Sequence, residues 1–236
     1  MTVLTQQIEE EIEYPSSDGE PMAESDITRD YMTYGVEALK QHFQGRSDVY
    51  VSANSFVYYE EGNKSAVVSP DIYVVFGVRK RQRDNYKIWK EAGIAPHFVL
   101  EITSETTQEV DREIKPETYR SLGVREYFQY DPSGDYLNPI LQGVRLVNNQ
   151  YEPIPVNNIA FDTLLHLVSG ELRFRNPQTG EFLKTYQQSE QARLAAESAL
   201  RSLISHLLNS GMNLEQVAQM MNLSTSEAQR LIGENE

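Results

Sequence analysis

DIYVVFGV, residues 71–78, is the stretch of sequence that decides the fold. A short, continuous apolar run of this kind is typical of a strand buried on both faces in the middle of a sheet. HFVLEIT, residues 97–103, has the same character, except that Glu101 interrupts it. The two runs predict central strands that can lie side by side, with a carboxylate at a position where burial is unfavourable.

Upstream of these runs, the sequence predicts a helix followed by short strands. Apolar residues recur every three to four positions over 26–43, and Ser25 or Asp26 is suited to cap that helix. Aromatic and β-branched residues between 49 and 68 predict two strands or a hairpin around a turn at 61–64.

Downstream, helix and strand alternate before a stretch of short strands. A helix is expected over 106–122, kinked or divided at Pro116 and ended by Gly123. A strand is expected over 125–130, and antiparallel β structure over 141–183. This mixture predicts an α/β or α+β fold.

The C-terminal part has a different composition and predicts helices. A helix is expected over 186–209, with an apolar stripe that needs a partner surface. Two shorter helices are expected to begin with capping boxes, the first at Asn213 and Gln216 and the second at Ser224 and Glu227. They could form a DNA-reading helix-turn-helix, but they carry little positive charge, so we favour oligomerisation or partner docking.

The net charge of −14 seems to argue against a nucleic-acid partner, but it is unevenly distributed along the 236 residues. Residues 1–26 contribute −8 because they hold eight acidic residues and no lysine or arginine, and residues 187–236 contribute −3. The remaining stretch, 27–186, carries only −3. We therefore expect an acidic leader over 1–18, a nearly neutral nuclease-like domain over 19–185 and a helical appendage over 186–236.

Composition excludes several classes of protein. No run approaches the roughly 18 to 20 apolar residues that span a bilayer, so no membrane segment is expected. The chain contains no cysteine, which excludes disulfides and thiolate metal sites, and its first residues lack the pattern of a secretory signal. We expect a cytoplasmic protein.

Two acids in the apolar runs, followed by a lysine, carry the most chemical information. Asp71 stands at the start of one predicted strand and Glu101 within another, and two buried carboxylates become tolerable when a divalent cation lies between them. Such hard oxygen ligands suit Mg²⁺ or Mn²⁺. Lys115, four residues after Asp111, could polarise a phosphate. The structural alternatives are a turn residue at Asp71, a solvent-facing or arginine-paired Glu101, and a surface Lys115–Asp111 pair.

Five fragments share an order and spacing with a known family. They are PMAESD (21–26), SPDIYVVFGV (69–78), FVLEITSETT (98–107), the D-x-x-x-K-P-x-x-Y stretch over 111–119, and GVREYFQYDP (123–132). Roughly residues 15–185 resemble the Uma-type family of cyanobacterial "putative restriction endonucleases", within the PD-(D/E)xK nuclease superfamily.

This resemblance implies a restriction-endonuclease-like core, with a central mixed β-sheet flanked by helices. It also implies a metal held by Asp71, Glu101 and the backbone carbonyl of Ile102, with Lys115 as the catalytic lysine. Glu24 would be an acid near the first helix.

The chain departs from the family pattern at two positions. The superfamily's lysine ordinarily stands two residues after the second acid, where this chain has Thr103, so Lys115 must reach in from the following helix. Members often have a histidine in the first helix, where this chain offers Thr28. A catalytically silent protein that keeps the nuclease fold and acts in nucleic-acid binding or assembly is therefore the alternative.

A basic segment follows the Asp71 strand, which would place it near the proposed metal site. Its positive residues are Arg79, Lys80, Arg81, Arg83, Lys87 and Lys90, with Tyr86 and Trp89 between them. They could contact nucleic-acid phosphates and stack on bases, or form a solvated surface that balances the acidic leader.

Taken together, these features favour a metal-dependent DNA endonuclease that hydrolyses phosphodiester bonds with Mg²⁺ or Mn²⁺. We expect a homodimer, with the C-terminal helices as the candidate surface of association.

Overall fold

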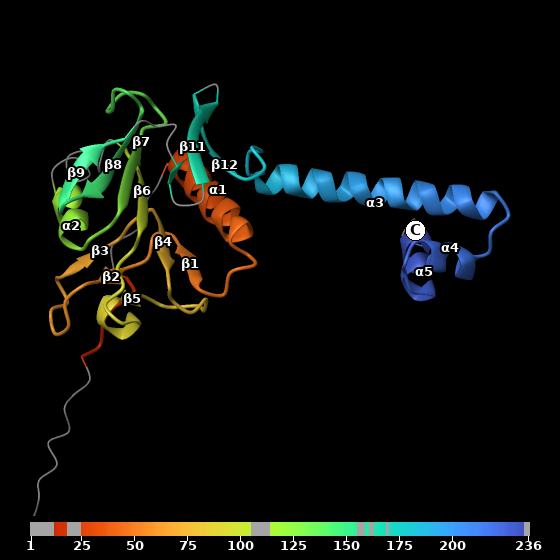
Figure 1. The fold of residues 1–236 in the computed structure, drawn as a ribbon, viewed down its shortest axis with the longest axis horizontal. Coiled ribbons are helices and arrows are strands. Elements are labelled where there is room, and N and C mark those ends of the chain that lie inside the picture. Colours follow the sequence, from red (N-terminus) through yellow and green to blue (C-terminus); the bar gives the residue numbers. More distant parts are fainter. Residues whose placement is uncertain are drawn as a thin grey trace, which may run out of the picture. The chain divides into compact units, whose positions relative to one another are not determined.

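The computed structural model describes residues 12–17, 25–104, 114–154, 159–160, 163–168 and 170–233 (Figure 1). The chain divides into two compact units, residues 1–183 and residues 184–236. The first unit contains the predicted central strands, and each unit is described by itself below.

A six-stranded mixed sheet forms the centre of the first unit (Figure 1). Its strands, in spatial order, are β1 (Val49–Ser52), β4 (Ile72–Phe76), β6 (Phe98–Ile102), β7 (Glu126–Tyr130), β8 (Leu141–Val147) and β9 (Gln150–Pro153). The strands β6 and β7 run parallel, and the other neighbouring pairs run antiparallel. The two apolar runs are therefore adjacent inner strands, β4 and β6, and the expected α/β class with a mixed sheet is confirmed.

One face of this sheet packs against the first helix, α1 (Asp26–His42). Alternate residues of the strands point to this face, including Ile72 of β4 and Phe128 of β7. Gly35 of α1 lies so close to Ile72 that a side chain at this position would collide with it. The predicted helix over 26–43 is confirmed, and the Ser25 side chain caps it by accepting a hydrogen bond from the Thr28 N–H.

The opposite face is covered by a second helix and a small sheet. The helix is α2 (Lys115–Ser121), which lies in the connection between the parallel strands β6 and β7. The small sheet consists of β2 (Val57–Tyr58), β3 (Val67–Val68) and β5 (Tyr86–Lys87), followed by the 3₁₀ helix η1 (Ile88–Glu91). The antiparallel pair of β2 and β3 is the expected hairpin.

Pro116 lies at the start of α2, and the expected kink or division of a longer helix stays a prediction. It occupies the first turn of α2, where a missing backbone N–H removes no helical hydrogen bond. The expected earlier portion of this helix falls on residues 105–113, outside the described residues. The helix ends just before Gly123, whose φ of +77° is readily adopted by glycine.

The rest of the first unit is antiparallel β structure, as expected from the sequence. Besides β8 and β9, a separate sheet contains β10 (Ile159–Ala160), β11 (Thr163–Val168) and β12 (Glu171–Arg175). Leu172 and Phe174 of β12 are buried and join the core beneath α1. This small sheet therefore extends the apolar layer on the α1 face.

The second unit is helical, with α3 (Tyr186–Asn209), α4 (Leu214–Met220) and α5 (Thr225–Gly233). Asn213 and Gln216 form a reciprocal capping box at α4, and Ser224 and Glu227 exchange equivalent hydrogen bonds at α5. Ile204 in the apolar stripe of α3 is fully buried, and α3 contacts both short helices. None of the helices described is both long enough and apolar enough to cross a membrane.

Candidate active site

The two predicted carboxylates meet because of the register between β4 and β6. Ile72 pairs with Leu100 and Tyr73 with Val99, so the same register, extended by one residue, sets Asp71 opposite Glu101. The backbone N–H of Asp71 donates to Glu101 Oε2 at 3.3 Å, and the backbone N–H of Ile102 donates to Asp71 Oδ2 at 2.7 Å. Each carboxylate is thus held by the backbone of the other strand.

Glu101 is fully buried and is held by two side chains of α2. The Lys115 Nζ lies 2.9 Å from Glu101 Oε2, and the Tyr119 hydroxyl donates to Glu101 Oε1 at 2.6 Å. Lys115 and Tyr119 are four residues apart, so they project from the same face of the helix. This arrangement satisfies both oxygens of a carboxylate that would otherwise be costly to bury.

Tyr119 was part of a motif in the sequence, but its role became clear only in the folded protein. Its burial, together with the negative charge of Glu101, raises the pKa of the Tyr119 hydroxyl well above its ordinary value. The hydroxyl therefore stays protonated at neutral pH and acts as a fixed hydrogen-bond donor. The spacing of four residues from Lys115 is the signal that could have identified it.

The structural alternatives for Glu101 and Lys115 do not describe this site. Glu101 is 0% exposed and pairs with a lysine, so it is neither solvent-facing nor arginine-paired. Lys115 is turned toward Glu101, and Asp111 lies outside the described residues. Glu24 also falls outside the described residues.

The two positions that depart from the family pattern are both buried. Thr103 has no hydrogen-bond partner for its hydroxyl within the described part of the chain, and it follows Glu101 by two residues along the strand direction. Thr28 lies in the first turn of α1, where its hydroxyl is 2.9 Å from the Ser25 Oγ. Thr28 therefore contributes to the helix start, while Thr103 leaves an unsatisfied polar atom near the carboxylates.

The donor set fits a hard divalent cation. Asp71 and Glu101 supply carboxylate oxygens, and together with Lys115 they give the cluster a formal charge of −1. Among the described residues, no group of three or more His, Cys, Asp or Glu side chains could hold a metal. A cation here would therefore need further oxygen ligands, such as the Ile102 carbonyl and water, and Mg²⁺ characteristically keeps several waters.

The start of the basic segment does not lie beside these carboxylates. Asp71 immediately precedes β4, whereas Arg79 follows the other end of the strand. The backbone N–H of Lys80 bonds to the carbonyl of Ser47, just before β1, whose first residue pairs with Phe76. Five residues of extended strand, about 16 Å, separate the two ends, so Arg79 and Lys80 do not lie near the metal site as expected. Lys87 belongs to β5, which pairs with β2, and β2 pairs with β3 shortly before Asp71.

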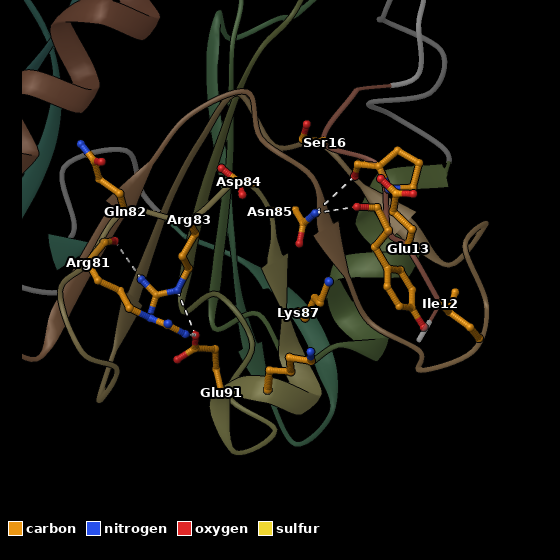
Figure 2. Close-up of a pocket in the computed structure, with 13 residues that line it drawn as sticks. Ile12, Glu13, Ser16, Arg81, Gln82, Arg83, Asp84, Asn85, Lys87 and Glu91 are labelled. Atoms are coloured by element: carbon orange, nitrogen blue, oxygen red, sulfur yellow. Dashed lines mark hydrogen bonds and ion pairs between the residues drawn. The ribbon is translucent and has the colours of Figure 1, made fainter. Parts of the chain in front are cut away.

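Several charges of the basic segment are used within the fold (Figure 2). Arg81 and Arg83 both donate to Glu91 Oε1, at 2.7 Å and 2.9 Å. The Arg83 guanidinium also lies 4.3 Å from the centre of the Tyr50 ring, and its side chain is only 4% exposed. Arg83 therefore holds the segment in place, which does not fit its expected role as a phosphate contact.

The N-terminal leader contacts the basic segment through the Tyr14 and Pro15 carbonyls, which accept hydrogen bonds from Asn85, the residue labelled in Figure 2. The Asn85 amide donates to the Tyr14 carbonyl at 2.9 Å, and the Tyr58 hydroxyl donates to the Pro15 carbonyl at 2.8 Å. The Lys87 ammonium lies 4.6 Å from the centre of the Tyr14 ring. Residues 12–16 and 81–91 line a shared cavity of about 620 Å³. The sequence indicated a charge balance between the acidic leader and this segment, whereas the contacts seen here use the Tyr14 ring and two backbone carbonyls.

Comparison with known proteins gives one family and a distant structural likeness. No curated protein matches the sequence. A solved structure described as "a putative nuclease belonging to DUF820", from Anabaena variabilis, is 14% identical and covers 59% of this chain and 73% of its own, with a TM-score of 0.38. The family model Uma2, described as "Putative restriction endonuclease", matches residues 4–175. The chain therefore belongs to the Uma2 family.

Proposed function

We propose that this protein is a metal-dependent DNA endonuclease that hydrolyses phosphodiester bonds with Mg²⁺ or Mn²⁺. The observation that carries this proposal is the contact between Lys115 and the buried Glu101, at 2.9 Å, beside Asp71. Asp71 and Glu101, at the neighbouring ends of two inner strands, would supply oxygen ligands for a cation. Lys115 would supply an ammonium for a phosphate. Membership of a family described as restriction endonucleases supports the same chemistry.

Each residue of the cluster has a proposed role. Asp71, Glu101 and the Ile102 carbonyl would hold the cation, which when bound supplies Lewis-acid polarisation of the phosphodiester and lowers the pKa of an attacking water. Lys115 would pair with a phosphate oxygen and balance its charge. Tyr119 would orient Glu101 through its hydrogen bond, as residues behind metal ligands commonly do. Glu24 is proposed as a further acid of the site.

We assign nucleic-acid contact to four cations of the basic segment. Arg79, Lys80 and Arg81 are exposed and Lys87 is partly exposed, and Arg83 is left out because its guanidinium is buried against Glu91 and Tyr50. Each nucleotide of a strand advances about 3.4 Å along the axis of a duplex, so about 16 Å along the axis corresponds to roughly five nucleotides. Arg79 and Lys80 would therefore contact DNA away from the scissile phosphate.

We also propose a homodimer in which the helical C-terminal unit mediates association. Leu194 and Leu203 of α3 are 52% and 48% exposed, which leaves apolar surface on this helix beyond the buried Ile204. The absence of cysteine fits a reducing, cytoplasmic setting.

A plasmid-cleavage assay with Mg²⁺ or Mn²⁺ tests the proposed function. Wild-type protein should cleave, and Asp71→Ala and Glu101→Ala should each lower the rate by about 1,000-fold, because the cation loses a carboxylate ligand. Glu117→Ala is the matched control, since Glu117 lies on α2 but pairs with Arg120 on the protein surface. Cleavage that survives both active-site substitutions would contradict the site, and absence of wild-type cleavage on several DNA forms would favour the noncatalytic alternative.

A further inference from the structure

A row of polar side chains continues from the candidate active site across the sheet. Glu101 of β6 pairs with Gln129 of β7, and Gln129 pairs with Gln142 of β8. Residues that pair across neighbouring strands point to the same face of a sheet, and strands are about 4.8 Å apart. Gln129 and Gln142 therefore extend the line of Asp71 and Glu101 by about 5 and 10 Å on the face covered by α2.

A cavity of about 590 Å³ lies at this end of the row. Its walls include Pro116, Tyr127, Gln129, Gln142, Tyr151 and Ile154. The volume falls within the range of about 300–1,000 Å³ that is common for small-ligand sites. Pro116 directly follows Lys115 in the sequence, so the cavity begins beside the residue whose ammonium contacts Glu101.

The lining of this cavity is uncharged and combines flat apolar groups with carboxamides. The rings of Tyr127 and Tyr151 are stacked, with an angle of 26° between their planes, and the Tyr151 hydroxyl is fixed by a bond to the Val124 carbonyl. The Gln142 amide donates to the Pro139 carbonyl at 3.1 Å. A carboxamide has two donor hydrogens and two acceptor lone pairs, so this single bond leaves Gln142 able to pair with a ligand.

These features match a nucleobase better than a phosphate or a cation. A base is neutral and flat, it packs against apolar and aromatic surfaces, and its edge presents donors and acceptors that glutamine amides can match. A phosphate would instead need cationic partners, and the lining contains none. The charged end of the row, at Asp71 and Glu101, therefore suits a phosphodiester with its cation. The uncharged end, at Gln129 and Gln142, suits a base.

We propose that this cavity binds one unstacked nucleobase of the nucleotide next to the scissile phosphate. This inference rests on the proposed endonuclease function and adds its substrate class, which is single-stranded or locally opened DNA. A base inside a duplex is stacked on its neighbours, so it must leave the stack to enter a pocket in the protein. The separation of about 5 to 10 Å between Glu101 and the two glutamines suits a phosphodiester and its own base.

Abasic scanning of single-stranded DNA tests the proposal on the wild-type protein. Oligonucleotides that differ only in the position of one abasic residue are cut under single-turnover conditions with Mn²⁺. An abasic residue next to the cleaved phosphate should slow cleavage by about tenfold, because the contacts of one base are lost. The same lesion several nucleotides away should have little effect.

Variants of the β8–β9 hairpin link that effect to the cavity. Gln142→Ala should slow cleavage of the intact oligonucleotide and leave cleavage of the abasic one unchanged, because the lost partner is already missing there. Gln150→Ala is the control, since Gln150 is an exposed residue of the same hairpin outside the cavity. It should behave as wild type on both substrates.

The possible failures are distinct. If wild-type protein cleaves DNA but the abasic scan shows no position-dependent effect, the base cavity is refuted and the endonuclease function stands. An equal response of Gln142→Ala and Gln150→Ala refutes it in the same way. If wild-type protein cleaves none of these oligonucleotides nor any plasmid, the proposed function fails and the base cavity fails with it.

Discussion

The carboxylate cluster and the start of the basic segment lie at opposite ends of the same strand, β4, and differ in how their charges are neutralised. In the cluster, the buried Glu101 is held in place by Lys115 and Tyr119, beside a second acid, Asp71. In the basic segment, Arg81 and Arg83 share Glu91, and Arg83 also packs on Tyr50. The cluster has one more carboxylate than ammonium, and it is the region for which we propose chemistry, whereas the basic segment uses part of its positive charge for packing.

The two regions also differ in how deeply their charged side chains are buried. Glu101 is 0% exposed, so its negative charge is stable only while partners neutralise and hydrogen-bond it. Lys80 at the other end is exposed to solvent, and it forms no ion pair with the residues that the structure describes. Changes at the cluster should therefore affect both stability and chemistry, while changes at the exposed cations should affect only binding.

Among the changes that compare the two regions, the largest effect is expected for Lys115→Met. Cleavage should fall by about 100-fold, because the substrate phosphate loses an ammonium. The variant should also unfold more easily, by about 3 kcal/mol, since Glu101 remains buried without its ion-pair partner. Single-turnover cleavage and urea unfolding measure the two effects.

Lys40→Met is the control for Lys115→Met, because Lys40 forms only an exposed pair with Glu37. It should change neither measurement appreciably. Full cleavage activity in Lys115→Met would contradict the proposed role of Lys115 in binding the substrate phosphate. Its role would then be purely structural.

A smaller effect is expected from charge reversal in the basic segment. Lys80→Glu combined with Lys87→Glu should weaken DNA binding about tenfold at low salt and lower the slope of log affinity against log salt by about 2, since two phosphate contacts are lost. Fluorescence anisotropy over a salt series measures both quantities. Lys64→Glu, at an exposed turn position, is the control for net charge.

This outcome decides between the two interpretations of the basic segment. If the double variant and Lys64→Glu bind DNA equally well, the segment is a solvated and packed surface with no role in binding. The rate of cleavage at saturating DNA should be the same as that of wild type, because neither lysine belongs to the carboxylate cluster of Asp71, Glu101 and Lys115.

The smallest expected effect concerns Glu91 and its pH dependence. The Arg83 hydrogen bond outweighs partial burial and lowers the pKa of the Glu91 carboxyl below its ordinary value of 4.5. The unfolded chain then takes up this proton at a higher pH than the folded one, so the stabilisation is present above about pH 4.5 and is lost as pH falls through the folded pKa.

Comparison of wild type with Glu91→Gln measures this contribution. The difference in free energy of unfolding should be about 1 kcal/mol at pH 7 and should shrink toward zero below pH 4. A difference that stays constant from pH 7 to pH 3 would show that the carboxylate charge is not what stabilises the segment.

Much of the local structure could be predicted because short-range physics determines it. The α1 helix follows from apolar spacing and the Ser25 cap, and the caps of α4 and α5 follow from Asn213 and Ser224. The expected kink or division at Pro116 stays a prediction, because residues 105–113 lie outside the described ones and a proline is compatible with a first turn as well as with a kink.

The candidate site could be predicted in part. Asp71 and Glu101 stood out as acids in apolar strands, and Lys115 as a lysine on the next helix. Tyr119 and Gln129 could not be identified from the sequence, because tyrosine and glutamine are common in many environments. Only the hydrogen bond from Tyr119 to Glu101 and the strand pairing of Gln129 with Glu101 show that they belong to this site.

The sequence by itself determined which segments become the two central strands, which residues begin the helices, and that Glu101 lies within an apolar strand. These properties depend on neighbours a few positions away. Only the tertiary structure decided that Asp71 meets Glu101, that Lys115 and Tyr119 both contact Glu101, and that Arg79 and Lys80 lie at the other end of β4. Strand direction and register fix these distances, and both arise from packing between parts of the chain that are far apart in sequence.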